Sequence, residues 1–132
     1  MRILFSGSRT FFDDQVVILM LERLIEKTKN ASAMTIVHGG APGLDSIVGV
    51  LAKSRGMQVE IHRADWHIHG KAAGVLRNQK MVDLGADLVV AYPLPGGSGT
   101  QDCIQRAVKA GIPTLVYDST SGNYTRWSMP EK

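Results

Sequence analysis

The sequence has little cysteine: Cys103 is the only one among its 132 residues. A single thiol cannot form a disulfide within the chain, so the fold must depend on its core. The N-terminus enters the apolar stretch Ile3–Phe5 directly and lacks the basic head and cleavage site of a secretory signal. No apolar run approaches the roughly 20 residues that a membrane-spanning helix needs. We therefore expect a cytoplasmic protein with no membrane partner.

The chain also has only a small excess of positive over negative residues. The formal net charge is +3, and the lysine and arginine residues are scattered along the chain instead of forming a basic stripe. This pattern gives no electrostatic footprint for nucleic acid, so we expect a small anionic ligand and not DNA as the partner. The length fits one domain, and a hydrophobic fraction of 44% with 20% charged residues is ordinary for a folded globular chain.

Five short apolar runs rich in β-branched residues predict strands, and four amphipathic segments between them predict helices. The first helix places Val17, Leu21 and Leu24 on one face, and Asp13 or Asp14 is suited to cap its N-terminus. Glycines after three of the helices are typical left-handed C-caps. The predicted strands are Arg2–Phe5, Met34–Val37, Gln58–Ile61, Leu88–Tyr92 and Thr114–Tyr117, and the predicted helices are Asp14–Lys29, Leu44–Ser54, Lys71–Leu84 and Thr100–Ala110.

The alternation of strands and helices predicts an α/β fold: a single Rossmann-like domain with a parallel sheet of about five strands and helices on both faces. The run Leu88–Ala91 is apolar throughout, as a central strand buried on both faces requires. We assign residues 1–118 to this domain. The polar residues 119–132 are expected to form a C-terminal tail without regular structure.

Ligands of open parallel sheets bind outside the carboxyl ends of the strands. Four loops follow those ends: Ser6–Arg9, His38–Gly43, Arg63–Trp66 and Pro93–Thr100. Two of them are rich in glycine, which allows backbone N–H groups to approach an anion, and a helix begins just after each. Neither loop is a P-loop or a Gly-x-Gly-x-x-Gly fingerprint. We therefore expect a phosphate group held in another way, between the Gly39–Gly40 turn and Gly96–Thr100.

These loops carry a family resemblance that covers nearly the whole chain. The sequence resembles the SLOG superfamily, named for the Smf/DprA and LOG proteins, and is most similar to its small YspA-like branch. The matching stretches are Gly7–Arg9, Val37–Asp45, Ala64–Trp66, Gly70–Met81, Ala86–Asp87 and Pro95–Thr100.

The resemblance implies a Rossmann-like fold that binds nucleotides or nucleotide-derived ligands. In the LOG branch it implies a phosphoribohydrolase that splits nucleoside monophosphates, with an arginine four residues before a methionine, as Arg77 and Met81 stand here. That branch also has a glutamate three residues after the threonine of the Pro-Gly-Gly-x-Gly-Thr loop. This chain has Cys103 there, with Asp102 one residue earlier. On this basis we expect Cys103→Glu to supply a missing carboxylate.

Individual residues have alternative roles. Arg77 is suited to bidentate contact with phosphate or is a solvated helix residue. Asp45 meets a ribose hydroxyl or caps a helix, and Trp66 stacks on a base or packs under the next helix. Arg77 and Asp102 are the catalytic candidates if the protein is an enzyme. The predicted ligand-binding residues are Gly7, Ser8, Arg9, Gly39, Gly40, Asp45, Arg77, Asn78, Gly96, Gly97, Ser98, Gly99 and Thr100.

The sequence thus predicts a module that senses or sequesters a phosphorylated nucleotide-like ligand, with a phosphoribohydrolase as the alternative. No cofactor is expected. No metal is expected either, because His62, His67 and His69 lack companion ligands. Three apolar residues near the C-terminus, Tyr124, Trp127 and Met129, together with the oligomers usual among SLOG proteins, favour a homo-oligomer, a dimer or larger.

Overall fold

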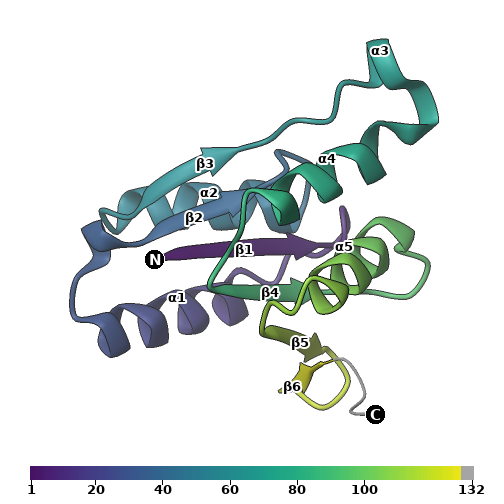
Figure 1. The fold of residues 1–132 in the computed structure, drawn as a ribbon. Coiled ribbons are helices and arrows are strands. Elements are labelled where there is room, and N and C mark those ends of the chain that lie inside the picture. The colour runs from purple at the N-terminus through teal and green to yellow at the C-terminus, as the bar shows by residue number, and fades with distance from the viewer. Residues whose placement is uncertain (129–132) are drawn as a thin grey trace.

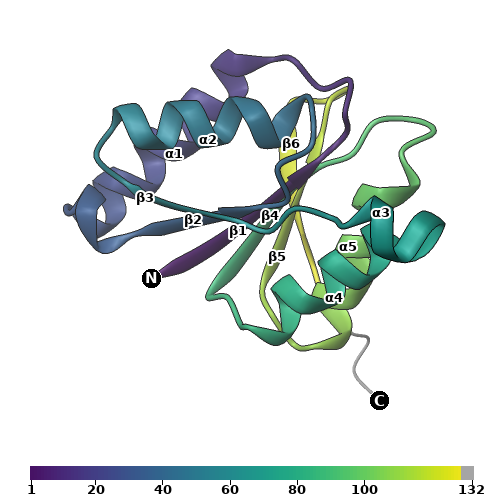
Figure 2. The ribbon, with the colours of Figure 1, turned by 90° about the horizontal axis from the view of Figure 1, so that it is seen from above.

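The computed structural model describes residues 1–128, which form a six-stranded sheet covered by helices on both faces. Figure 1 shows the strands side by side, from β3 at the top to β6 at the bottom, and Figure 2 shows α1 and α2 on one side of the sheet and α4 and α5 on the other. The elements are β1 (Arg2–Gly7), α1 (Asp14–Thr28), β2 (Thr35–His38), α2 (Leu44–Ser54), β3 (Gln58–Ile61), α3 (Trp66–His69), α4 (Ala73–Asp83), β4 (Leu88–Tyr92), α5 (Ser98–Lys109), β5 (Thr114–Asp118) and β6 (Asn123–Trp127), with 3-10 turns at Ala31–Ala33 and Gly70–Ala72.

The predicted α/β class and Rossmann-like parallel sheet are confirmed. The strand order is β3-β2-β1-β4-β5-β6, and the first five strands are parallel. The chain moves outward from β1 in one direction and then returns to start again at β4. The switch point between β1 and β4 is where open sheets of this kind leave a crevice at the carboxyl ends of the strands.

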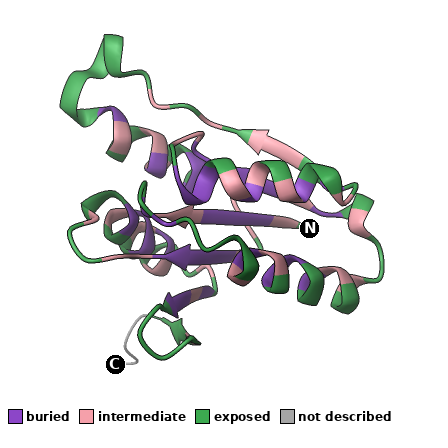
Figure 3. Cartoon of the chain, turned by 180° about the vertical axis from the view of Figure 1, so that it is seen from behind, coloured by how far each residue is buried: buried purple, intermediate pink, exposed green. Residues whose placement is uncertain are grey.

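Side chains alternate across the central strands and build a core on each face. On β1, Ile3 and Phe5 pack with the buried faces of α1 and α2, while Leu4 points to the opposite face. There it meets Met81 of α4 and Cys103 of α5. Figure 3 shows the central strands buried and the outer surfaces of the helices exposed. No helix within residues 1–128 combines the length and the apolar character that crossing a bilayer would require.

The helix ends follow their expected chemistry. Asp13 caps α1 by accepting a hydrogen bond from the Val16 amide at 3.3 Å. The C-cap of the same helix is Lys29, which has a left-handed backbone (φ 57°) and whose N–H donates to the Ile25 carbonyl at 2.7 Å. Two helices begin two residues away from their predicted starts: α4 begins at Ala73 after a 3-10 turn, and α5 begins earlier, at Ser98.

The prediction that residues 119–132 lack regular structure is wrong for Asn123–Trp127. These residues form β6, which pairs antiparallel with β5 at the edge of the sheet. Tyr124 explains the pairing, because its hydroxyl shares a 2.8 Å hydrogen bond with the hydroxyl of buried Tyr92 and its ring packs against Tyr117. Tyr124 therefore serves its own domain, which weakens the case for a dimer made by the tail. Met129 lies outside the described residues.

We predict that Tyr124→Phe lowers the free energy of unfolding by about 1–2 kcal/mol, because the Tyr92 hydroxyl then loses its partner inside the core. Urea denaturation followed by circular dichroism measures the change. Thr125→Val, on the same strand, is the control and should alter stability much less. Equal stabilities of Tyr124→Phe and the unmodified chain would show that β6 does not depend on this hydrogen bond.

Candidate functional site

A cavity of about 740 Å³ lies at the switch point between β1 and β4. The loops that follow these two strands and the facing helices α2, α4 and α5 form its walls. All the predicted ligand-binding residues except Gly39 and Gly40 line it, and so does the catalytic candidate Asp102. The structure thus brings these residues together at one site, and their roles toward a ligand stay predictions.

The loop Pro95–Thr100 forms one wall and leads directly into α5. Gly97 is the N-cap of this helix, and no side chain within residues 1–128 caps it. The first turn also has no acidic residue. The positive end of the helix dipole is therefore directed at the cavity without a protein anion to neutralise it. The hydroxyls of Ser98 and Thr100 add hydrogen-bond donors beside this helix end.

The Gly39–Gly40 turn differs from its predicted role, because its amides already have partners. The N–H groups of Gly39 and Ala41 donate to Asp45 Oδ2 at 3.2 Å each, and the Gly40 N–H donates to His38 Nδ1 at 3.0 Å. Gly39 has a different role: a Cβ there would displace the guanidinium of Arg77 from its present position. The prediction that Gly39 and Gly40 cradle an anion is therefore wrong, and their turn supports Arg77 and Asp45.

A buried asparagine organises the opposite wall. Asn78, only 3% exposed, accepts a hydrogen bond from Arg77 Nε at 2.9 Å. Its side-chain amide donates to the Gly99 carbonyl at 3.2 Å and to Asp102 Oδ2 at 3.0 Å. Arg77 is also held by a 2.7 Å bond from Nη1 to the Gly39 carbonyl. Asn78 therefore positions a cation, a carboxylate and the start of α5 with a single side chain.

Asp45 is another buried polar residue of the cavity wall. It is 5% exposed, and its Oδ1 atom has no hydrogen-bond partner within the described part of the chain. Burial raises the pKa of this carboxyl to about 6, although the amides of Ala41 and Gly39 and the nearby charge of Arg77 act in the opposite direction. Its bonds tie the β2–α2 loop together, so Asp45 is not a simple cap of α2.

Cys103 lies outside the cavity. Its side chain is fully buried between α5 and the sheet, and burial raises the pKa of the thiol to about 11. A glutamate at position 103 would place a carboxylate in the apolar core, so the prediction that Cys103→Glu supplies a catalytic group is wrong. On α5, the carboxylate that lines the cavity is Asp102, which forms an ion pair with Arg106 at 2.8 Å.

The lining also contains residues that the predicted site omits, among them Ser6, Thr10, Trp66 and Lys71. Trp66 and Lys71 lie within stretches that carry the family resemblance, Ala64–Trp66 and Gly70–Met81, and this resemblance was the signal that could have added them to the predicted site. The segment Trp66–His69 forms the short helix α3, and Trp66 is 50% exposed, which argues against a packing role. His62 pairs with Glu60 at 2.6 Å, and His67 and His69 are exposed on α3. Residues 1–128 contain no cluster of three metal-ligating side chains.

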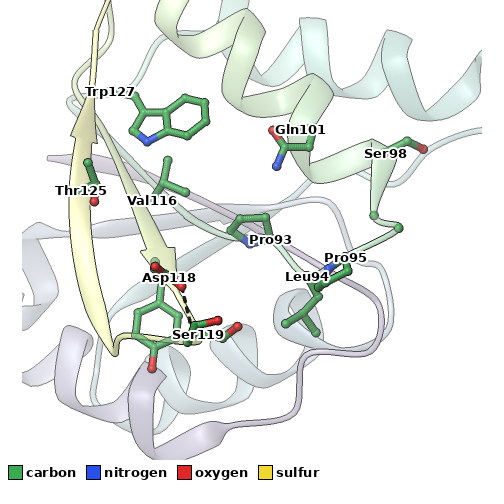
Figure 4. A pocket seen from close by; sticks show the side chains of 14 residues that line it. Pro93, Leu94, Pro95, Ser98, Gln101, Val116, Asp118, Ser119, Thr125 and Trp127 are labelled. Atoms are coloured by element: carbon green, nitrogen blue, oxygen red, sulfur yellow. Dashed lines mark hydrogen bonds between the residues drawn. The ribbon is translucent and has the colours of Figure 1, made fainter.

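A second cavity of about 730 Å³ lies on the other side of the Pro95–Ser98 loop. Figure 4 shows Trp127 and Thr125 of β6 facing it from one side and Gln101 of α5 from the other. Pro93, Leu94 and Val116 contribute apolar surface to it, and within residues 1–128 no arginine or lysine belongs to its lining. This composition is less suited to an anion than the cavity at the switch point.

Comparison with known proteins finds similarity in sequence and in structure. The model of a family described as "YspA, cpYpsA-related SLOG family" matches residues 1–69. The gene 61 protein of Mycobacterium phage D29 is 42% identical over 121 residues, covering 88% of this chain and 95% of the phage protein. A solved structure of DNA processing protein A from Helicobacter pylori superposes with a TM-score of 0.66 at 18% identity, covering 90% of this chain and 66% of that one.

The structural match corrects one expectation. DNA processing protein A is described as binding single-stranded DNA. The expectation of a small anionic ligand and not DNA as the partner is therefore contradicted, because a protein of the same fold binds single-stranded DNA. Scattered positive charges along the sequence were a poor guide, since residues far apart in the chain, such as Arg9, Lys71 and Arg77, come together at the cavity.

The buried carboxyl of Asp45 predicts a pH effect. The folded chain retains a proton up to about pH 6 that the unfolded chain releases near the ordinary value of 3.8. The contribution of Asp45 to the free energy of unfolding must therefore fall as the pH rises through this window. Asp45→Asn keeps an acceptor oxygen and removes the titration. We expect the stability of Asp45→Asn relative to the unmodified chain to increase by about 2–3 kcal/mol between pH 4 and pH 7.

Urea denaturation at pH 4, 5.5 and 7 measures both proteins. The comparison removes the effects of the other titrating groups, because they are common to the two chains. Parallel stability profiles across this range would show that Asp45 does not carry the raised pKa.

Proposed function

We propose that this chain, which belongs to the YspA, cpYpsA-related SLOG family, binds a phosphorylated ligand of the nucleotide class in the cavity at its switch point, as a sensor or sequestering module. The observation that carries the proposal is the uncapped N-terminus of α5, directed at a cavity lined by Arg9, Lys71 and Arg77. Backbone amides, the helix dipole and fixed cations together favour a phosphate group.

The cations and the helix end have complementary roles in this proposal. The free amides at the start of α5 are fixed by the backbone, so they bind an anion without losing side-chain freedom. Arg77 is likewise held in place by Gly39 and Asn78. Its guanidinium is planar and suited to two hydrogen bonds with phosphate oxygens. A preorganised site of this kind loses little entropy when the ligand binds.

A second candidate function is hydrolysis of the N-glycosidic bond of a nucleoside 5'-monophosphate. The observation that favours it is Asp102, whose carboxylate lines the cavity beside Arg77 and Asn78. A carboxylate near the sugar stabilises an oxocarbenium-like transition state. However, Asp102 Oδ2 already accepts hydrogen bonds from Arg106 and Asn78 at 2.8 and 3.0 Å. The ion pair offsets its negative charge, and for this reason we favour binding without turnover.

Gly97→Val tests the phosphate site. Gly97 has a backbone conformation that any residue adopts (φ −88°). An added Cβ would lie 3.3 Å from the Leu94 carbonyl oxygen, a tight contact that requires a shift of a few tenths of an ångström, so far-UV circular dichroism verifies that the variant is folded. Its methyl groups would fill the approach to the helix end. We expect calorimetry with adenosine 5'-monophosphate to show at least a tenfold loss of affinity, a change of about 1.4 kcal/mol. Gln105→Val, on the exposed side of α5, is the control; equal affinities in the two variants would contradict the proposal.

Binding and hydrolysis are separated by incubating the protein with nucleoside monophosphates and measuring free base by chromatography. We expect binding with little or no base release, because Asp102 is neutralised by Arg106. Asp102→Asn should then change the rate of base release very little. Brisk base release by the unmodified chain, lost in Asp102→Asn, would establish the hydrolase instead.

A further inference from the structure

Trp66 stands at the mouth of the cavity with half of its surface exposed. It is the first residue of α3, which projects beyond the carboxyl ends of the strands in Figure 1. Asp65 caps this short helix by accepting a 3.0 Å hydrogen bond from the Ile68 amide, which fixes the backbone that carries the indole. A tryptophan with only a packing role would be covered, because its ring has a large apolar surface.

The two neighbours of the indole are suited to a planar guest. The guanidinium of Arg9 lies over the Trp66 ring, 5.7 Å from its centroid. Gly74, at the start of α4, lies close enough that a Cβ there would contact the ring at 3.4 Å. Gly74 therefore lets the indole lie against α4. Arg9, from the loop after β1, lies over the ring. Indole faces and guanidinium planes both stack on nucleobases.

We propose that Trp66 and Arg9 form the subsite for the aromatic base of the ligand. This inference rests on the proposed function, which places a phosphate at the N-terminus of α5 in the same cavity. The cavity then has a cationic, hydrogen-bonding end for phosphate and an aromatic end for the base. The ligand it fits is a nucleotide, and a sugar phosphate or free phosphate lacks the group that Trp66 recognises.

Fluorescence gives a direct readout, because the chain has two tryptophans and only Trp66 lines this cavity. Trp127→Phe leaves Trp66 as the only indole. Titration of this variant with adenosine 5'-monophosphate should quench the Trp66 emission, because a stacked base quenches an indole. Ribose 5-phosphate and inorganic phosphate should bind without comparable quenching.

Affinities measured by calorimetry complete the test. Adenosine 5'-monophosphate should bind roughly tenfold or more tightly than ribose 5-phosphate, in line with the usual strength of base–aromatic stacking. Trp66→Ala should abolish this advantage, and Trp66→Phe should keep most of it. Trp127→Ala, which removes the indole of the second cavity, is the matched control and should leave the advantage intact. Far-UV circular dichroism verifies that each variant is folded.

The outcomes distinguish this inference from the proposed function. If adenosine 5'-monophosphate and ribose 5-phosphate bind equally well and Trp66→Ala changes neither, the base subsite is wrong and the phosphate site stands. If none of the three ligands binds, the proposed function fails. If an oligothymidylate without a terminal phosphate quenches Trp66 while the mononucleotide does not, the subsite belongs to single-stranded DNA, and the inference of a mononucleotide ligand is overturned.

Discussion

The side-chain amide of Asn78 is the interaction on which the candidate site depends. It is buried between α4 and α5, and its oxygen and nitrogen face different partners: Arg77 on one side, and Asp102 and the Gly99 carbonyl on the other. A buried amide must satisfy both ends, because an unpaired polar group inside the protein costs free energy. The amide therefore has one favourable orientation, and that orientation holds the arginine, the carboxylate and the α5 loop in a fixed relation.

This relation determines the chemistry of the cavity. Arg77 is fixed at its Nε by Asn78 and at its Nη1 by the Gly39 carbonyl, so it presents its charge from a defined position. Asp102 Oδ2 accepts a hydrogen bond from Arg106 Nε, and this ion pair reduces the capacity of Asp102 to act as a free carboxylate. Asp45 remains the one buried carboxyl with an unpaired oxygen among the described cavity residues. Strong cations and weakened anions at one edge of the sheet favour an anionic ligand.

The two relatives are similar to this chain in different respects, one in sequence and the other in fold. The relative from Mycobacterium phage D29 aligns with this chain over 95% of its own length at 42% identity, so the similarity extends over nearly the whole of both sequences. DNA processing protein A shares the fold at 18% identity, a level at which the arrangement of the sheet is comparable and the site residues are not.

Most of the elements could be predicted from the sequence, because their signals are local. Continuous apolar runs indicated the central parallel strands, and the spacing of Val17, Leu21 and Leu24 indicated α1. The loop Pro95–Thr100 was recognisable for the same reason, since its glycines and the helix after it lie within one short stretch. The polar sequence of β6 gave no such signal, because an edge strand is stabilised by its partner β5 and by one long-range contact, Tyr92 with Tyr124.

Tertiary structure alone decided which groups of the site are free. The sequence placed Gly39, Gly40, Asp45 and Arg77 near one edge of the sheet, but hydrogen bonds between distant residues determined that the two glycines support the site and do not line it. It also decided between adjacent positions on α5, where Asp102 faces the cavity and Cys103 faces the core. Neighbouring helix residues point about 100° apart, and only the packing of α5 against the sheet determines which one meets the ligand.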